Sequence, residues 1–290
     1  MKIKDILKNG RVNISCELSP PRALTSLDDT AGIVAQLAKL SPSFMSVTYG
    51  AAGTAAEAAK TIEVARQIYV DNHITALSHM TCINATDEVI ESTLDTLRAD
   101  GIENLLALRG DIPDGYEIRP DAKYRHASDL AEKIKSYGDF CVGGACYPEG
   151  HVESGNRAQD IENLKIKVSS GCDFLTTQMF FDNNILYSFM FRLLKAGIDI
   201  PIIAGIMPVV NAKQITRICS LSGTALPPRF TAIVDRFGQD PASMRQAGIA
   251  YATDQIIDLI ANGVTNIHLY TMNKPDIAGK IFSNLSDIIN

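Results

Sequence analysis

The feature that most constrains this chain is a regular alternation of short apolar runs and longer amphipathic segments. The runs recur roughly every thirty residues and close on side chains that are mostly polar. Strand-like runs that alternate with helical patterns predict a parallel sheet. Eight such units can bury their apolar faces by closing into a (β/α)8 TIM barrel, whose functional side chains gather at the carboxyl ends of the strands. The runs are VNISCE at Glu17, FMSVTY at Thr48, ITALSH at His79, LLALRGD at Arg109 and Asp111, CVGGACY at Tyr147, FLTTQ at Gln178, IPIIAGIM at Met207 and NIHLYT at Thr271.

The length and spacing predict a single domain over residues 1–290. Barrels of this class run about 250 residues, and no low-complexity linker or change in composition divides the chain. About sixty residues separate the seventh and eighth runs. That stretch has helical patterns of its own at 211–221, 227–237 and 243–261, so we expect an elaborated connection between strands seven and eight.

The segments between the runs predict helices with defined ends. Residues 54–70 and 86–100 have clear amphipathic periodicity, and Thr86 is the expected N-cap of the second helix. A glycine that follows a helix supplies the left-handed conformation that turns the chain into the next strand. Four glycines are expected in this role: Gly101, Gly171, Gly197 and Gly263.

Composition excludes several classes of protein. The formal net charge is −6 at pH 7 and the basic residues are scattered, which argues against a nucleic-acid partner. The six cysteines form no C-x-x-C pair, as is typical of a reduced cytoplasmic protein. The amino end lacks the apolar stretch of a secretory signal, and no run approaches the roughly 20 apolar residues of a membrane span.

Two strand ends carry residues suited to acid and electrostatic catalysis. Glu17 lies in an apolar run, and burial raises the pKa of a carboxyl towards the range of a general acid. The alternative is a structural glutamate paired with Arg22 or with another cation at the mouth of the barrel. In LRGDIP, Gly110 would let the backbone approach a flat ligand and Asp111 would stabilise a positive charge. A cell-adhesion role for the tripeptide RGD is disfavoured, because here it ends a buried strand.

A polar stripe on one predicted helix suggests a ligand-binding face. Asp160, Asn163 and Lys167 share a helix face and could follow a ribose and phosphate chain, although a solvated flank beside the core is the simpler alternative.

Other side chains give no strong signal by themselves. His79, His126 and His151 lack the spacing of a metal site, so no metal is expected. Gln178 and Gln214 could be structural amides. The chain has neither a G-x-G-x-x-G nor a P-loop, which argues against those nucleotide sites.

Taken together, nine segments in register resemble the catalytic barrel of the methylenetetrahydrofolate reductase family, in its bacterial form. They span nearly the whole chain, whereas any one of them would be weak. The segments are E-x-x-PPR from Glu17, SVTYGA (46–51), SHMTCINAT (78–86), LALRGDIP (106–113), ASDL (127–130), YPEGH (147–151), TQMFFD (177–182), GIMPV (205–209) and YTMN (270–273).

The resemblance implies a noncovalently bound FAD and a folate substrate. The family's general acid falls on Glu17, its pterin-facing carboxylate falls on Asp111, and its substrate contacts fall on Gln178, Gln214 and Lys274. The implied FAD contacts are Thr48, His79, Leu108, Arg109, Gly110, Asp111, His126, Ala127, Tyr147, His151, Asp160, Asn163 and Lys167.

The implied reaction is a ping-pong reduction of 5,10-methylenetetrahydrofolate to 5-methyltetrahydrofolate by NAD(P)H, with NADH favoured. A related alternative is a flavin-bearing subunit that acts with an iron-sulphur partner, and another flavin barrel such as a proline dehydrogenase is a weaker one. The chain has no room after the eighth strand for the regulatory domain of eukaryotic relatives, so inhibition by adenosylmethionine is not expected. The resemblance leaves open whether the protein forms a homo-oligomer.

The chain departs from the family's pattern at several positions, which bear on cofactor and substrate affinity. Arg157 is a candidate to replace the cation lost at position 166. The departures are Cys16, Leu18 and Ser19 in place of aromatic residues, His126 in place of a tyrosine, Ile166 in place of an arginine, Ile218 in place of a phenylalanine and Lys274 in place of an arginine.

Overall fold

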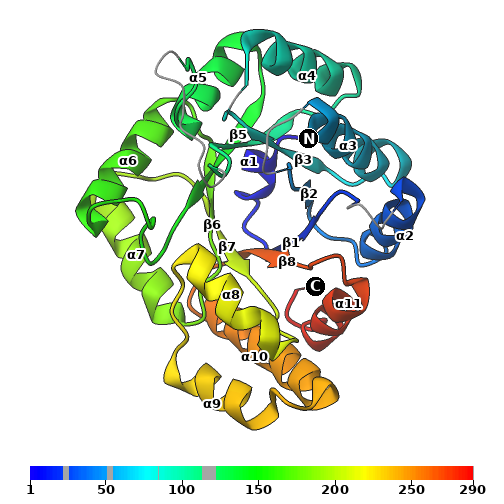
Figure 1. Ribbon diagram of the computed structural model, residues 1–290, viewed down its shortest axis with the longest axis vertical. Helices are drawn as coiled ribbons and strands as arrows, with labels where there is room; N and C mark the ends of the chain where they lie inside the picture. Colours follow the sequence, from blue (N-terminus) through cyan, green and yellow to red (C-terminus); the bar gives the residue numbers. More distant parts are fainter. Residues whose placement is uncertain (22–25, 51–54, 84, 113–121, 290) are drawn as a thin grey trace.

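Eight parallel strands close into one barrel in the order of the sequence (Figure 1). The computed structural model describes residues 1–21, 26–50, 55–83, 85–112 and 122–289. The predicted (β/α)8 barrel is therefore confirmed. The strands are β1 Asn13–Leu18, β2 Met45–Val47, β3 Ala76–Thr81, β4 Asn104–Leu108, β5 Cys141–Cys146, β6 Phe174–Thr177, β7 Ile202–Ile206 and β8 Asn266–Tyr270.

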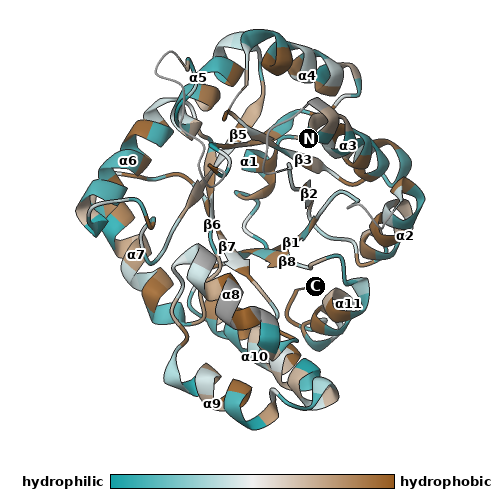
Figure 2. Cartoon of the chain, in the orientation of Figure 1, coloured by the Kyte–Doolittle hydropathy of each residue, from teal (hydrophilic) through white to brown (hydrophobic). Residues whose placement is uncertain are grey.

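Helices surround the barrel, and their apolar faces turn towards it (Figures 1 and 2). Helix α1 instead lies across the amino-terminal end of the strands, and α9 packs on the outside of α10. No helix in the described ranges is long and apolar enough to cross a membrane. The helices are α1 Ile3–Ile6, α2 Leu27–Ala38, α3 Ala55–Arg66, the π-helix η1 Gln67–Asp71, α4 Asp87–Ala99, α5 Ala127–Tyr137, α6 Arg157–Ser169, α7 Asn183–Lys195, α8 Ala212–Ser222, α9 Pro228–Phe237, α10 Pro241–Ala261 and α11 Pro275–Asn284.

The interior of the barrel is apolar near the amino-terminal ends of the strands and polar near their carboxyl ends. Phe44, Leu77 and Phe174 form a buried layer together with Ile3 and Ile6 of α1. The backbone N–H of Ile3 anchors α1 in this layer by donating a hydrogen bond to the side-chain oxygen of Asn104 at 2.8 Å. Because the lower layer excludes water, polar side chains higher in the barrel are reached only from the carboxyl ends of the strands.

Most of the predicted helix ends are confirmed. Thr86 caps α4 by accepting a hydrogen bond from the N–H of Val89. The four glycines predicted to end helices all have positive φ, between 76° and 106°. The three helical patterns between β7 and β8 form α8, α9 and α10.

The prediction of one α-helix over residues 54–70 is wrong at the carboxyl end. Regular α-helix stops at Arg66 and continues as the wider turn of η1. The amide of Asn72 donates to the carbonyl of Gln67 at 2.7 Å, which satisfies a carbonyl that the wider turn frees. Periodicity alone does not distinguish this turn from an α-helix.

Candidate functional site

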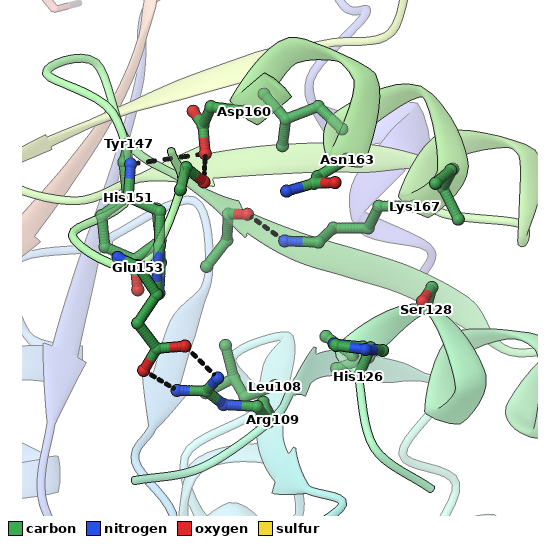
Figure 3. A pocket seen from close by; sticks show the side chains of 16 residues that line it. Leu108, Arg109, His126, Ser128, Tyr147, His151, Glu153, Asp160, Asn163 and Lys167 are labelled. Atoms are coloured by element: carbon green, nitrogen blue, oxygen red, sulfur yellow. Dashed lines mark hydrogen bonds and ion pairs between the residues drawn. The ribbon is translucent and has the colours of Figure 1, made fainter. Parts of the chain in front are cut away.

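A cavity of about 360 Å³ opens at the carboxyl ends of β4 and β5, beside α5 and α6 (Figure 3). Most of the residues that the resemblance assigns to FAD lie around it. The lining residues are Ala107, Leu108, Arg109, His126, Ala127, Ser128, Ala145, Tyr147, His151, Glu153, Ser154, Asp160, Asn163, Leu164, Ile166 and Lys167.

The polar stripe of α6 faces this cavity, as a role in ligand binding requires (Figure 3). Asp160 is 6% exposed and organises the loop after β5, since it accepts hydrogen bonds from the N–H of His151 at 3.3 Å and the hydroxyl of Ser154 at 3.0 Å. Lys167 donates to the carbonyl of Ala145 at 2.6 Å, and burial lowers the pKa of this lysine. A lysine with one carbonyl partner keeps further donors for a ligand.

Arg109 is held across the cavity by Glu153, a residue that sequence patterns did not single out. The guanidinium makes two hydrogen bonds to the carboxylate, at 2.5 and 2.8 Å. This bidentate pair raises the pKa of Arg109 and lowers that of Glu153. The two residues belong to different loops, so no spacing in the sequence signals the pair.

The amino end of α5 contributes a favourable site for an anion. His126, Ala127 and Ser128 line the cavity at the first turn of the helix. The carboxylate of Asp129 fixes the turn by accepting from the N–H groups of Arg125 and His126 at 2.8 and 2.9 Å. The positive end of a helix dipole stabilises phosphate groups.

Glu17 lies outside this cavity, between two imidazole rings in the polar part of the barrel. Its Oε2 is 3.6 Å from Nε2 of His79 on β3 and 3.7 Å from Nε2 of His268 on β8, and its side chain is 20% exposed. Burial raises the pKa of Glu17, but the interactions with His268, His79 and Ser46 together lower it below the ordinary value. The expectation of a raised pKa is therefore wrong for this structure, because sequence alone did not reveal these neighbours.

Both imidazoles are buried, and only His79 was a predicted site residue. Burial lowers the pKa of His79 to about 4, so this ring is neutral at pH 7. His268 is 2% exposed. The period-two alternation of NIHLYT places His268 and Tyr270 on one face of β8, and that was the available signal for an inward-facing histidine.

The YTMN segment locks β8 onto the end of β1. The Thr271 hydroxyl donates to the carbonyl of Glu17 at 2.5 Å. Asn273 accepts from the N–H of Ser19 at 2.8 Å and donates to its carbonyl at 3.0 Å. Met272 and Asn273 have φ of 52° and 56°, which forms the tight turn that brings this amide back to β1. The segment thus fixes the backbone that carries Glu17.

The turn after β4 needs a glycine because of its backbone conformation and its packing against Ile83. Gly110 has φ of 92°, and a Cβ there would lie 2.7 Å from Cγ2 of Ile83. Asp111 follows as an exposed side chain. Thr48, His79, Gly110 and Asp111 do not line the cavity, so their assignment to FAD stays a prediction.

The predicted substrate residues are dispersed. The Gln178 side chain accepts a hydrogen bond from the N–H of Met179 at 2.9 Å. Lys274 lines a small hollow together with Ile218, so two departures from the family pattern meet there. The side chain of Gln214 and the whole of Arg22 lie outside the described residues.

Arg157, the candidate to replace the arginine that is missing at position 166, lies away from Ile166. Ile166 lines the cavity and is 55% exposed. Arg157 instead lines a different hollow, with Arg192 and Asn184. The interpretation that Arg157 replaces the missing cation is therefore not supported by this arrangement.

The fold and the cavity define a class: a TIM barrel with a ligand site at the carboxyl ends of its strands. Residues 2–286 match the family described as methylenetetrahydrofolate reductase, and the chain belongs to that family. It is 33% identical to the 5,10-methylenetetrahydrofolate reductases of Pectobacterium carotovorum and Escherichia coli, covering 95% of this chain and 91% of each relative. Against methylenetetrahydrofolate reductase (NADH) 1 of Arabidopsis thaliana the identity is 33%, and the chain spans only 50% of that protein's length.

Solved structures of low sequence identity share the fold. One is an uncharacterized protein from Clostridium thermocellum that binds two copies of 5-methyl-5,6,7,8-tetrahydrofolic acid, with 12% identity, a TM-score of 0.59 and 99% coverage of both chains. Another is dihydropteroate synthase from Xanthomonas albilineans, with 13% identity, a TM-score of 0.55 and coverage of 97% of this chain and 94% of that one.

Proposed function

We propose that this protein is an FAD-dependent enzyme that reduces 5,10-methylenetetrahydrofolate to 5-methyltetrahydrofolate with NADH as donor. The observation that carries the proposal is the cavity, which gathers most residues of the predicted flavin set in a member of this family. The plant relative named for NADH supports the choice of donor. The folate-binding neighbour of the same fold is consistent with a folate substrate.

The residues around the cavity fit the polar part of a flavin dinucleotide. The first turn of α5 suits the pyrophosphate, and Asn163 and Lys167 on α6 offer donors to ribose and phosphate oxygens. Leu108 and Tyr147 add apolar surface for a ring system. FAD, when bound, supplies the hydride-transfer chemistry. The exposed Ile166 gives no hydrogen bond, so we expect cofactor binding weaker than an arginine would allow.

Glu17 and Asp111 would act on the folate. Protonation by Glu17 would open the imidazolidine ring of the substrate to an N5 iminium, and the charge of Asp111 would stabilise that cation. The Glu17 carboxyl is one-fifth exposed in this structure. A ring system stacked over it would remove its water and raise its pKa, as a proton donor at neutral pH requires.

Anaerobic spectroscopy of the purified protein tests the proposal. We expect mass spectrometry of the released ligand to find FAD, NADH to bleach the flavin absorbance, and methylenetetrahydrofolate to restore it. Release of FMN, or a reduced flavin that the folate does not reoxidise, would overturn the proposal. A flavin that dithionite reduces but NADH does not would instead favour a subunit that receives electrons from a partner protein.

A further inference from the structure

The ion pair between Arg109 and Glu153 sets the charge of the cavity at the ends of β4 and β5. Apart from two histidines, the charged side chains among its described lining residues are two cations, Arg109 and Lys167, and two carboxylates, Glu153 and Asp160. The lining is therefore formally neutral. This balance is unexpected for a site that is to hold a pyrophosphate, because binding surfaces usually carry the charge opposite to that of their ligand.

The two cations of the cavity differ in how they are held. Arg109 uses three of its five N–H donors within the protein, two on Glu153 and Nε on the carbonyl of Gly110 at 3.4 Å. Lys167 has its hydrogen bond to the carbonyl of Ala145 and no carboxylate within ion-pair distance in the described ranges. Lys167 can therefore meet a phosphate directly, whereas the charge of Arg109 is neutralised.

Glu153 is held in place by the loop between β5 and α6. Its backbone N–H donates to Nδ1 of His151 at 3.1 Å, and the hydroxyl of the next residue, Ser154, donates to the buried carboxylate of Asp160 at 3.0 Å. The bidentate contact with Arg109 fixes the carboxylate itself. A negative charge held there repels any phosphate that approaches the guanidinium.

The cavity has two chemically different ends (Figure 3). Lys167 and the first turn of α5, with Ser128, form the end that suits phosphates. Leu108 and Tyr147 lie at the other end with the ion pair and suit a ring system. FAD with its pyrophosphate at the first end would bring no phosphate to Arg109. A nucleoside diphosphate has no flavin ring, so its phosphates could lie against a free guanidinium instead.

We propose that Glu153 is a specificity-determining residue, which neutralises Arg109 and so prevents nucleoside diphosphates from occupying the cavity in place of FAD. This inference rests on the proposed function, because it takes FAD as the ligand. A repulsive charge discriminates between two ligands when only the wrong one has to approach it. Glu153 meets this condition, since it lies at the ring end of the cavity.

The variant Glu153→Gln tests the proposal, because glutamine keeps the size of the side chain and removes its charge. The apoprotein is titrated with ADP by calorimetry, and with riboflavin and FAD by quenching of flavin fluorescence. We expect ADP to bind about tenfold more tightly than it binds the wild type, FAD to stay within about threefold and riboflavin within about twofold. The gain for ADP should shrink at high salt, which screens exposed charges.

Glu162→Gln is the matched control for the loss of one negative charge. Glu162 lies on α6 outside the cavity lining and pairs with Lys165 at 2.7 Å, and its side chain is 59% exposed against 54% for Glu153. This control should leave the affinity for ADP unchanged. The double variant Arg109→Gln/Glu153→Gln should lose the gain for ADP, because the gain requires the freed guanidinium.

Two outcomes would overturn the proposal: ADP that binds Glu153→Gln no more tightly than the wild type, or FAD that gains as much as ADP does. The second would mean that Glu153 weakens all phosphate binding alike. Wild-type protein that binds no flavin would overturn the proposed function instead, and the ADP titrations would still decide whether Glu153 neutralises Arg109.

Discussion

At the scale of single residues, Glu17 is expected to serve only one half of the catalytic cycle. Reduction of the flavin by NADH needs no proton on a pterin nitrogen, whereas opening of the imidazolidine ring does. Glu17→Gln should therefore give near-normal anaerobic flavin reduction and almost no reoxidation by methylenetetrahydrofolate. Stopped-flow absorbance measures both steps. A variant that turns over folate within a few fold of wild type would show that the proton comes from another group.

Asp111 should matter for the charge that develops on the folate. Its side chain is exposed at the mouth of the barrel, directly after the turn at Gly110. Asp111→Asn should slow the folate half-reaction by about 10²- to 10³-fold and flavin reduction by much less, because only the former builds a cation. Equal losses in both half-reactions would mean that Asp111 only positions the flavin.

Ile166 should limit the affinity for FAD. Its exposed side chain lines the cavity, and an arginine there would add a bidentate donor for phosphate oxygens. Ile166→Arg should tighten FAD binding about tenfold in a fluorescence titration of the apoprotein. Arg157→Gln is the control and should leave the affinity unchanged, because Arg157 lines another hollow. Weaker binding in that control would show that Arg157 does reach the cofactor.

At the scale of elements, α10 packs unusually close to the loop after β7. Gly248 lies in this helix, and a Cβ there would be 1.8 Å from the carbonyl oxygen of Val209. A glycine within a helix costs about 1 kcal/mol relative to alanine. The close approach explains why a glycine stands there nonetheless.

Two glycine substitutions test this packing. Gly248→Ala should lower the free energy of unfolding by about 1 to 3 kcal/mol, since backbone must move to admit the methyl group. Gly32→Ala in α2 is the matched control: no atom lies within 4 Å of its Cβ position. That change should raise the free energy of unfolding by up to about 1 kcal/mol. Urea denaturation measures both, and equal effects would contradict the close packing of α10.

At the scale of the whole molecule, the barrel favours the neutral form of the buried His79. The free energy of unfolding therefore depends on pH. The pKa of His79 is about 4 in the folded protein and 6.5 without perturbation. Between these values the unfolded chain binds more protons than the folded one, so the free energy of unfolding falls as the pH is lowered.

The variant His79→Gln isolates this contribution to stability. From pH 7 to pH 5 the wild type should lose about 2 kcal/mol more than the variant. Urea denaturation at the two pH values gives the comparison. Parallel losses would show that His79 is protonated in the folded state.

Patterns in the sequence alone were enough to predict the barrel, the ends of most helices and the family. Period-two and helical patterns depend on local chain geometry, and glycines such as Gly101 are required by backbone conformation, so both can be read without tertiary contacts. Motifs such as LRGD and YTMN indicated the family because they occur together in order along the chain.

Only the tertiary structure decided how charges and protons are arranged around these residues. The pairing of Arg109 with Glu153 and the two imidazoles beside Glu17 join residues from different loops and strands. Their electrostatic effects fall off within a few ångströms, so they depend on distances that no sequence spacing specifies. For the same reason the direction of the Glu17 pKa shift was wrong from sequence: burial was foreseen, but the neighbours that oppose it meet only when the barrel closes.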